Sequence, residues 1–193
     1  MEKVTDPRQR YLLRTNKKWF NHYCEYILAG EILHVGNGLG YASALIKEKN
    51  QQLICLDVTV QKDTINKEDV VLYNGTKIPY EESSFDVVLC DYVLHHTPDP
   101  AQMITELIRV AKLNGLIIVI EQTYNNTFQR LKLFYSCWKQ NRDSGQNVGM
   151  YWRSYFSRSG SRSTFRTMNL EILDIISEQR KSSYTEMFVL KKK

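Results

Sequence analysis

The sequence predicts an α/β fold of the doubly wound kind, an open parallel sheet with helices on both faces. Short apolar runs recur along residues 31–121 with helix-forming segments between them, which is typical of this class. Several of the runs end in an acidic residue or in a turn that contains glycine. Because ligands bind at the carboxyl ends of such strands, we expect the functional site at that edge of the sheet.

The chain opens with a helix and then a strand. Asp6-Pro7-Arg8-Gln9 has an N-cap residue, a proline at the first helical position and a glutamine three residues after the cap, and Gly30 is a plausible stop. Residues 31–36 form the first strand. The helix after its glycines extends to about Asn50.

Four further apolar runs complete the parallel part of the sheet. We expect strands over residues 53–56, 70–73, 85–90 and 116–121, with a short or irregular helix within 60–67 and a helix over about 100–112. The helix again begins with a capping pattern at Asp99, and Asn114-Gly115 turns the chain into the most apolar strand.

Residues 124–193 follow a different pattern. A helix is predicted to carry Phe128, Leu131, Phe134, Tyr135 and Trp138 on one face, followed by a loop over 144–147 and a further helix over 150–157. Strand-like segments at about 170–178 and 184–190, separated by a polar turn near 179–182, predict a terminal antiparallel hairpin.

Length and composition favour one domain over residues 1–193, located in the cytoplasm. The chain has 193 residues, of which 42% are hydrophobic and 24% charged, and no apolar run is long enough to span a bilayer. The first residues lack the apolar stretch of a secretory signal. The cysteines, Cys24, Cys55, Cys90 and Cys137, lie far apart, so we expect neither a metal site nor disulfides.

Charge is unevenly distributed along the chain. Residues 1–123 contain 13 basic and 16 acidic side chains, a balance of −3, whereas residues 124–193 contain 13 and 5, a balance of +8. A basic surplus attracts phosphates or anionic lipid, or is simply a solvated surface.

The glycines after the first strand indicate a cofactor site. Gly36, Gly38 and Gly40 allow positive φ and a close approach of a ligand to the main chain, and the next helix begins with free N–H groups. A dinucleotide fingerprint places its third glycine or alanine where this chain has Tyr41, or Ser43 if the pattern starts at Gly38. The spacing therefore argues against a nicotinamide cofactor.

A series of motifs resembles the class I S-adenosylmethionine-dependent methyltransferases. The glycine turn resembles their motif I, and it is followed in order by Lys77-Ile78-Pro79-Tyr80, Ser84-Phe85-Asp86-Val87-Val88, Val93-Leu94-His95-His96, Glu106-Leu107-Ile108-Arg109-Val110 and Asn114-Gly115. The resemblance implies a Rossmann-like sheet of seven strands in the order 3-2-1-4-5-7-6 with strand 7 antiparallel. It also implies S-adenosylmethionine as cofactor and S-adenosylhomocysteine as product.

The same resemblance implies a division of the chain. We expect an N-terminal helix in residues 1–30, a cofactor-binding core in 31–121, substrate or lid helices in 122–168 and the terminal hairpin in 169–193.

The expected cofactor residues lie at the strand ends. Asp57 is placed to accept hydrogen bonds from the ribose hydroxyls, Asn74-Gly75 stands where the family reads adenine, and Asp91 faces the methionine end. The full set is His34, Gly36, Asn37, Gly38, Gly40, Asp57, Val58, Asn74, Gly75, Asp91 and Tyr92. His34, Asn37 and Asn74 depart from the family pattern and reduce the negative charge around a cationic cofactor.

The expected reaction is methyl transfer to a small-molecule acceptor held in line with the methyl–sulfur bond. His95 and His96 are the candidate general bases. Two enzymatic alternatives remain: a transfer RNA methyltransferase that uses the basic half of the chain, and a membrane-surface lipid or quinone methyltransferase that uses residues 126–140 as an interfacial helix. A catalytically silent partner subunit is the alternative from another class. The oligomeric state cannot be read from the sequence.

Overall fold

The fold is built on one mixed sheet, seen in a computed structural model that describes residues 6–27, 29–144, 148–180 and 183–193. The strand order is β3-β2-β1-β4-β5-β8-β7, and a short strand, β6, pairs with β5 beside this path. The strands are β1 (Ile32–Val35), β2 (Leu53–Asp57), β3 (Val70–Leu72), β4 (Phe85–Asp91), β5 (Ala111–Tyr124), β6 (Phe156–Ser157), β7 (Leu170–Gln179) and β8 (Tyr184–Lys192). β8 pairs antiparallel with both β5 and β7, and all other pairs are parallel.

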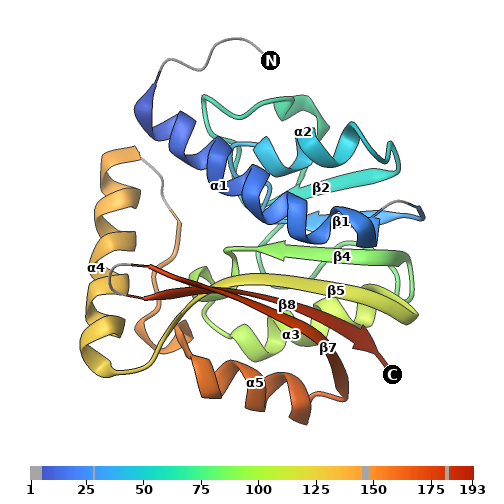
Figure 1. Ribbon diagram of the computed structural model, residues 1–193. Coiled ribbons are helices and arrows are strands. Elements are labelled where there is room, and N and C mark those ends of the chain that lie inside the picture. The colour runs from blue at the N-terminus through green and yellow to red at the C-terminus, as the bar shows by residue number, and fades with distance from the viewer. Residues whose placement is uncertain (1–5, 28, 145–147, 181–182) are drawn as a thin grey trace.

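Helices cover both faces of the sheet and one of its ends. In Figure 1, α1 (Pro7–Tyr23) and α2 (Tyr41–Lys47) lie on one face, and α3 (Pro100–Val110) and α5 (Arg158–Thr167) lie on the other. α4 (Thr127–Ser144) stands at the end toward which β4 points. The 3-10 turns are η1 (Cys24–Ile27), η2 (Lys67–Asp69), η3 (Leu94–His96) and η4 (Trp152–Ser154). The carboxyl ends of the parallel strands therefore face α4.

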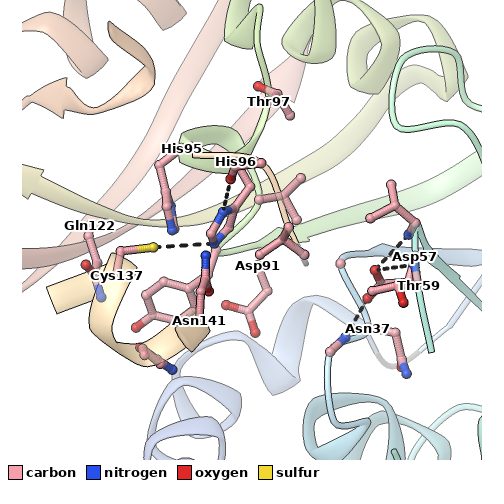
Figure 2. Close-up of a pocket in the computed structure, with 18 of the residues that line it drawn as sticks. Asn37, Asp57, Thr59, Asp91, His95, His96, Thr97, Gln122, Cys137 and Asn141 are labelled. Carbon is pink, nitrogen blue, oxygen red and sulfur yellow. Dashed lines mark hydrogen bonds between the residues drawn. The ribbon is translucent and has the colours of Figure 1, made fainter. Parts of the chain in front are cut away.

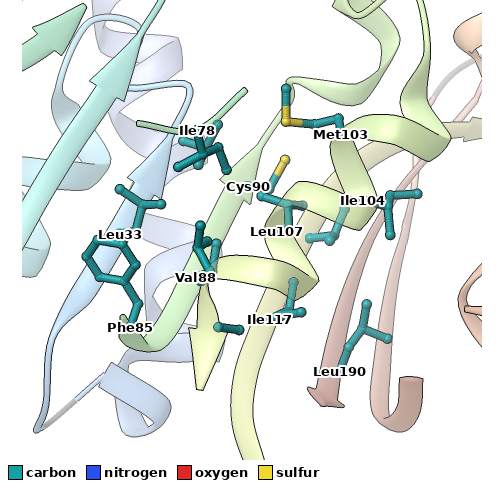
Figure 3. Packing of buried hydrophobic residues seen from close by; sticks show 14 of the residues in the cluster. Leu33, Ile78, Phe85, Val88, Cys90, Met103, Ile104, Leu107, Ile117 and Leu190 are labelled. Carbon is teal, nitrogen blue, oxygen red and sulfur yellow. The ribbon is translucent and has the colours of Figure 1, made fainter. Parts of the chain in front are cut away.

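Two apolar layers hold the helices to the sheet. On one side, Met103, Ile104 and Leu107 of α3 pack with Val88 and other side chains of the sheet, as Figure 3 shows. On the other side, an equivalent layer joins α1 and α2 to the sheet through Trp19, Phe20, Tyr23, Leu45 and Ile46. Burial on both faces is the reason that the central strands read as unbroken apolar runs.

The predicted helix caps are present. The Asp6 carboxylate accepts a hydrogen bond from the Gln9 amide at 3.0 Å, and the Asp99 carboxylate accepts one from the Gln102 amide at 3.0 Å. Each cap satisfies one amide that the first turn of a helix leaves without a partner.

The sheet order predicted from the resemblance is confirmed, with the terminal strands renumbered because β6 precedes them. The helix predicted over residues 150–157 is wrong: this stretch forms η4 and β6, and the helix α5 begins only at Arg158. Its N-cap is Ser157, whose hydroxyl accepts from the Gly160 amide. The loop predicted at 144–147 lies outside the described residues apart from Ser144, as do residues 181–182 of the predicted terminal turn.

Within the described part of the chain, none of the helices combines the length and the apolar character that crossing a membrane requires.

Candidate functional site

A cavity of about 1020 Å³ opens at the carboxyl ends of β1, β2 and β4. The glycine turn forms one wall of this cavity, and the strand ends together with η3 form a second wall. Residues of α1 and of the inner face of α4 complete the lining. Figure 2 shows the cavity with Asp57 and Asn37 on one side and His95, His96 and Cys137 on the other. Its volume is at the upper end of the range for ligand sites, which leaves room for a cofactor and a small acceptor together.

The glycine turn presents bare main chain to this cavity. Gly38 has φ of 54°, and a Cβ atom there would meet no heavy atom of the protein within 4 Å. Gly40 has φ of 80°, and a Cβ atom there would lie 2.7 Å from the Ile65 carbonyl oxygen. Gly40 is thus required by packing, whereas the open space beside Gly38 is available to a ligand.

Asp57 is fixed at the end of β2 by backbone donors. Its Oδ2 accepts from the Gly38 amide at 2.7 Å, and its Oδ1 accepts from the Val58 amide at 2.7 Å and the Thr59 amide at 3.3 Å. Burial raises the pKa of this carboxyl, although the backbone amides act in the opposite direction. A carboxylate has about four acceptor positions, so Oδ2 keeps capacity for a hydroxyl donor in the cavity.

Asn74 and Gly75 also line the cavity, but the Asn74 amide oxygen is committed to its own loop. It accepts from the Thr76 amide at 3.0 Å, the Thr76 hydroxyl at 2.9 Å and the Lys77 amide at 3.1 Å. Val58 lies so close to Gly75 that a Cβ atom at position 75 would come within 3.0 Å of Val58 Cγ1, and Val58 is 47% exposed, so the two residues present an apolar surface to the cavity.

His34 does not line the cavity, in contrast to the other predicted cofactor residues. It is buried behind the glycine turn, where its Nδ1 lies 2.7 Å from the Ser43 hydroxyl oxygen. The Ser43 hydroxyl donates to Asn37 Oδ1 at 2.5 Å, so His34 Nδ1 must carry the proton that completes the chain. Burial lowers the pKa of His34 to about 4. The residue supports the turn and has no access to a ligand in the cavity.

Asp91 supplies an oxygen that needs a donor. It lines the cavity, and its Oδ1 is buried and makes no hydrogen bond within the described part of the chain. Burial, followed by the charge of Glu121, raises the pKa of this carboxyl to about 7. The neighbouring Tyr92 also lines the cavity and adopts φ of 55°, which turns the chain sharply at the end of β4. An unpartnered carboxylate oxygen in this position fits the ammonium group of an amino acid moiety.

His95 and His96 lie together in η3 and face Cys137 of α4. His95 is buried, with Nδ1 2.5 Å from Glu121 Oε1. His96 Nδ1 lies 2.7 Å from the Gly149 carbonyl oxygen, and its Nε2 lies 3.8 Å from Cys137 Sγ. Burial by itself lowers the pKa of His95, but Glu121 more than offsets this and raises it. The two imidazoles lower the pKa of the Cys137 thiol against the effect of burial.

The inner face of α4 lines the cavity, although its residues are not among those predicted from the sequence. Leu133, Cys137 and Asn141 recur every four residues, are buried and line the cavity. The exposed aromatic side chains on the outer face are the stronger apolar signal in the sequence and concealed this pattern. The signal in the sequence is the spacing of four itself, which puts Leu133, Cys137 and Asn141 on one face of a helix.

A family model described as a methyltransferase domain matches residues 33–119. Among curated proteins, the chain is 26% identical to an uncharacterised methyltransferase of Bacillus subtilis over 100 residues, and 27% identical to a probable S-adenosylmethionine-dependent methyltransferase of Mycobacterium tuberculosis over 116 residues. It is 32% identical over 78 residues to a demethylmenaquinone methyltransferase of Oceanobacillus iheyensis. These alignments cover 47%, 58% and 40% of this chain and 40%, 42% and 29% of the respective relatives, so the chain matches less than half of each.

Solved structures share the fold over nearly the whole chain. The PH0226 protein of Pyrococcus horikoshii superposes with a TM-score of 0.69 at 16% identity, covering 99% of this chain and 94% of that one. An S-adenosylmethionine-dependent methyltransferase of Aquifex aeolicus superposes with a TM-score of 0.61 at 16% identity, covering 98% and 95%. The sheet order, the glycine turn and the match of a methyltransferase-domain model over residues 33–119 agree, and together they support a class I S-adenosylmethionine-dependent methyltransferase.

Proposed function

We propose that the protein transfers the methyl group of S-adenosylmethionine to a small-molecule acceptor inside the cavity at the end of the sheet. The observation that carries the proposal is the continuity of this cavity. It extends from the glycine turn and Asp57 to η3 and the inner face of α4, so both reactants have room within one space.

The cofactor half of the cavity offers three complementary features. Asp57 accepts from the ribose hydroxyls, the apolar surface of Val58 and Gly75 packs against the adenine, and Asp91 accepts from the ammonium of the methionine moiety. S-adenosylmethionine supplies a methyl group already activated by the sulfonium charge. The protein's contribution is to exclude water and to hold the acceptor atom about 3 to 3.5 Å from that methyl group.

The acceptor half lies under α4. His95 and His96 remain the candidate general bases, and Glu121 orients His95 as a carboxylate orients a catalytic imidazole. The segment 122–168, expected to bind the substrate, contributes to the cavity wall, with Gln122, Cys137 and Tyr151 among its lining residues. Trp152 lies outside the lining of this cavity and stacks with Arg130, whose guanidinium carbon is 4.4 Å from the ring centroid.

The proposal is tested by calorimetry with S-adenosylmethionine. We expect binding by the wild-type protein, and a loss of about 2 to 4 kcal/mol, or roughly 30-fold to 1000-fold in affinity, in Asp57→Ala, because two charge-assisted hydrogen bonds disappear. Asp63→Ala, which removes an exposed carboxylate from the same region, serves as the matched control. Absence of binding by the wild-type protein would refute the proposal and favour the silent-subunit alternative.

A specific observation favours a membrane-surface acceptor as the second candidate. Phe128, Leu131, Tyr135 and Trp138 form one stripe on the outer face of α4 and are 43–64% exposed. Cationic side chains flank the stripe: Lys132 lies over the Phe128 ring, and Arg142 over the Trp138 ring. An exposed aromatic face bordered by basic residues is typical of an interfacial helix. The inner face of the same helix lines the cavity, so an apolar acceptor such as a quinone would have a short path to the site.

Flotation with lipid vesicles tests this second candidate. We expect the protein to float with vesicles that contain anionic phospholipid, and the double variant Tyr135→Glu/Trp138→Glu to remain in the soluble fraction. The control is Leu173→Glu, which places the same charge at an exposed apolar position of β7. Equal flotation of all three proteins, or none by the wild type, would contradict the interfacial role of α4.

The transfer RNA alternative has no comparable support. Arg158 and Arg162 of the basic half bind the buried Glu186 carboxylate at 3.1 and 2.7 Å. Arg130 stacks on Trp152. Part of the positive charge is therefore used inside the fold and does not form a track for phosphates.

A further inference from the structure

Three metal-binding side chains meet in the acceptor half of the cavity. His95 and His96 are consecutive residues of η3, and Cys137 comes from the middle of α4. Each offers a ligand atom, and these atoms all lie within 4.8 Å of one another. His95 and Cys137 are buried, and all three residues line the cavity (Figure 2).

Both imidazoles are oriented by a hydrogen bond at Nδ1. Nδ1 of His95 is bonded to the Glu121 carboxylate at 2.5 Å, and Nδ1 of His96 donates to the Gly149 carbonyl at 2.7 Å. This leaves Nε2 of each ring as the free ligand atom. A carboxylate or a backbone carbonyl on the second nitrogen is the arrangement that fixes the ring orientation of metal-binding histidines.

We propose that His95, His96 and Cys137 form a zinc site with two imidazole nitrogens, one thiolate sulfur and a fourth position open to the cavity. With zinc–sulfur bonds of about 2.3 Å and zinc–nitrogen bonds of about 2.0 Å, a tetrahedral ion holds sulfur and nitrogen about 3.5 Å apart. Nε2 of His96 is 3.8 Å from Cys137 Sγ, which is already close to that spacing. Three protein ligands with one open position are typical of reactive zinc sites, whereas structural zinc sites are closed by four.

The open position faces the acceptor half, and here the inference rests on the proposed function. A zinc ion in this place lowers the pKa of a hydroxyl or thiol group that binds to it. The acceptor class that fits is therefore a compound that presents a hydroxyl or a thiol. A histidine whose nitrogen holds the metal is not a free base, so the site and a general-base role for the same histidine exclude each other.

Cobalt(II) titration of the chelator-treated full-length protein, without S-adenosylmethionine, tests the site. We expect one cobalt ion per chain with a sulfur-to-cobalt charge-transfer band in the near ultraviolet, and displacement of the cobalt by zinc. Cys137→Ser should abolish the band, and His96→Ala should weaken binding at least 10-fold. Cys24→Ser, which removes a half-buried thiol from η1, is the matched control and should behave as the wild type.

The zinc inference is overturned if the wild type shows no charge-transfer band, or if Cys137→Ser keeps it. The cluster is then a thiol hydrogen-bonded to two imidazoles. If Cys137→Ser does not fold, His96→Ala decides, because it leaves the thiol in place. Calorimetry with S-adenosylmethionine on the same samples separates the two proposals: zinc binding without cofactor binding refutes the methyl transfer and leaves the metal site.

Discussion

At the scale of single residues, His34 shows how an unusual side chain is accommodated next to a cofactor turn. The chain from His34 through Ser43 to Asn37 is buried and uncharged. Asn37 lines the cavity while His34 does not, so the histidine that stands at the family's usual acidic position acts on the turn from behind and does not face the cavity.

The burial of His34 predicts a dependence of stability on pH. Its pKa is about 4 in the folded protein and about 6.5 in the unfolded chain, so between these values only the unfolded chain binds the proton. The free energy of unfolding should therefore fall by about 3 kcal/mol as the pH falls from 7 to 4 through this group.

Urea denaturation of the wild type and of His34→Asn measures this effect. The asparagine keeps a donor for Ser43 and does not titrate, so the stability of the wild type relative to the variant should decline on acidification. Parallel curves for the two proteins between pH 7 and pH 4 would show that His34 does not supply the pH dependence.

At the level of residues, local signals are the easiest to interpret. Asp57 and the glycines line the cavity as expected, because a strand end and its turn are encoded within short stretches of sequence, and their role as cofactor ligands stays a prediction. The contact between His96 and Cys137 spans 41 residues and depends on where α4 crosses the end of the sheet. The expectation of no metal site rests on the spacing of the cysteines along the chain, and a cluster that joins two histidines to a cysteine 41 residues away leaves no such spacing in the sequence.

At the scale of elements, a pair of residues on α3 holds the turn that follows the cavity-lining residues Asn74 and Gly75. Arg109 donates to the carbonyl oxygens of Tyr80 at 2.7 Å and Ile78 at 2.9 Å, and it pairs with Glu106. Glu106 in turn accepts from the Ile78 amide at 2.8 Å. The Glu-x-x-Arg pattern thus has a mechanical explanation, because it holds the turn that follows Asn74 and Gly75.

Arg109→Met should lower the free energy of unfolding by about 1 to 3 kcal/mol, because two carbonyl oxygens and Glu106 lose their donor in a partly exposed setting. Chemical denaturation measures the change, with the exposed substitution Lys62→Met as control. Equal midpoints for the two variants would mean that the turn is held by its own backbone.

Element prediction was best for buried strands and poorest for residues 150–157. A continuous apolar run such as Leu116–Ile120 buries all of its side chains only as a central strand covered on both faces, and it forms part of β5. The aromatic stretch near Tyr151 has apolar spacing that suits a helix. Tertiary contacts decide otherwise, since Phe134 and Tyr155 pack ring against ring and β6 pairs with β5.

At the scale of the whole molecule, the cavity is lined by two helices that lie far apart in the sequence, α1 and α4. The inner face of α4 lines it on one side, and Tyr11, Leu12, Thr15 and Asn16 of α1 line it on the other. α1 is also tied to the terminal hairpin, through Lys18 with Glu178 at 2.9 Å and through the Tyr11 hydroxyl, which accepts from Arg180 at 2.8 Å. Any ligand that fills the cavity therefore contacts helices that are more than 100 residues apart in sequence.

Hydrogen exchange tests this arrangement. At 100 times its dissociation constant, S-adenosylmethionine should slow amide exchange by up to about 100-fold where opening releases the ligand. We expect the effect in residues 11–16 of α1 and 133–141 of α4 and none in α5. Uniform protection, or protection confined to the glycine turn, would contradict a ligand site that α1 and α4 line.

The position of β8 has a consequence for synthesis on the ribosome. This strand, buried from Thr185 to Leu190, lies between β5 and β7, so β5 keeps an unpaired apolar edge until β8 has emerged. An uncovered edge of this kind is a template for pairing with other chains. During translation, the cofactor-binding half of the protein is therefore complete while the edge of β5 is still unpaired. We expect chaperone binding to this edge to matter most in that interval.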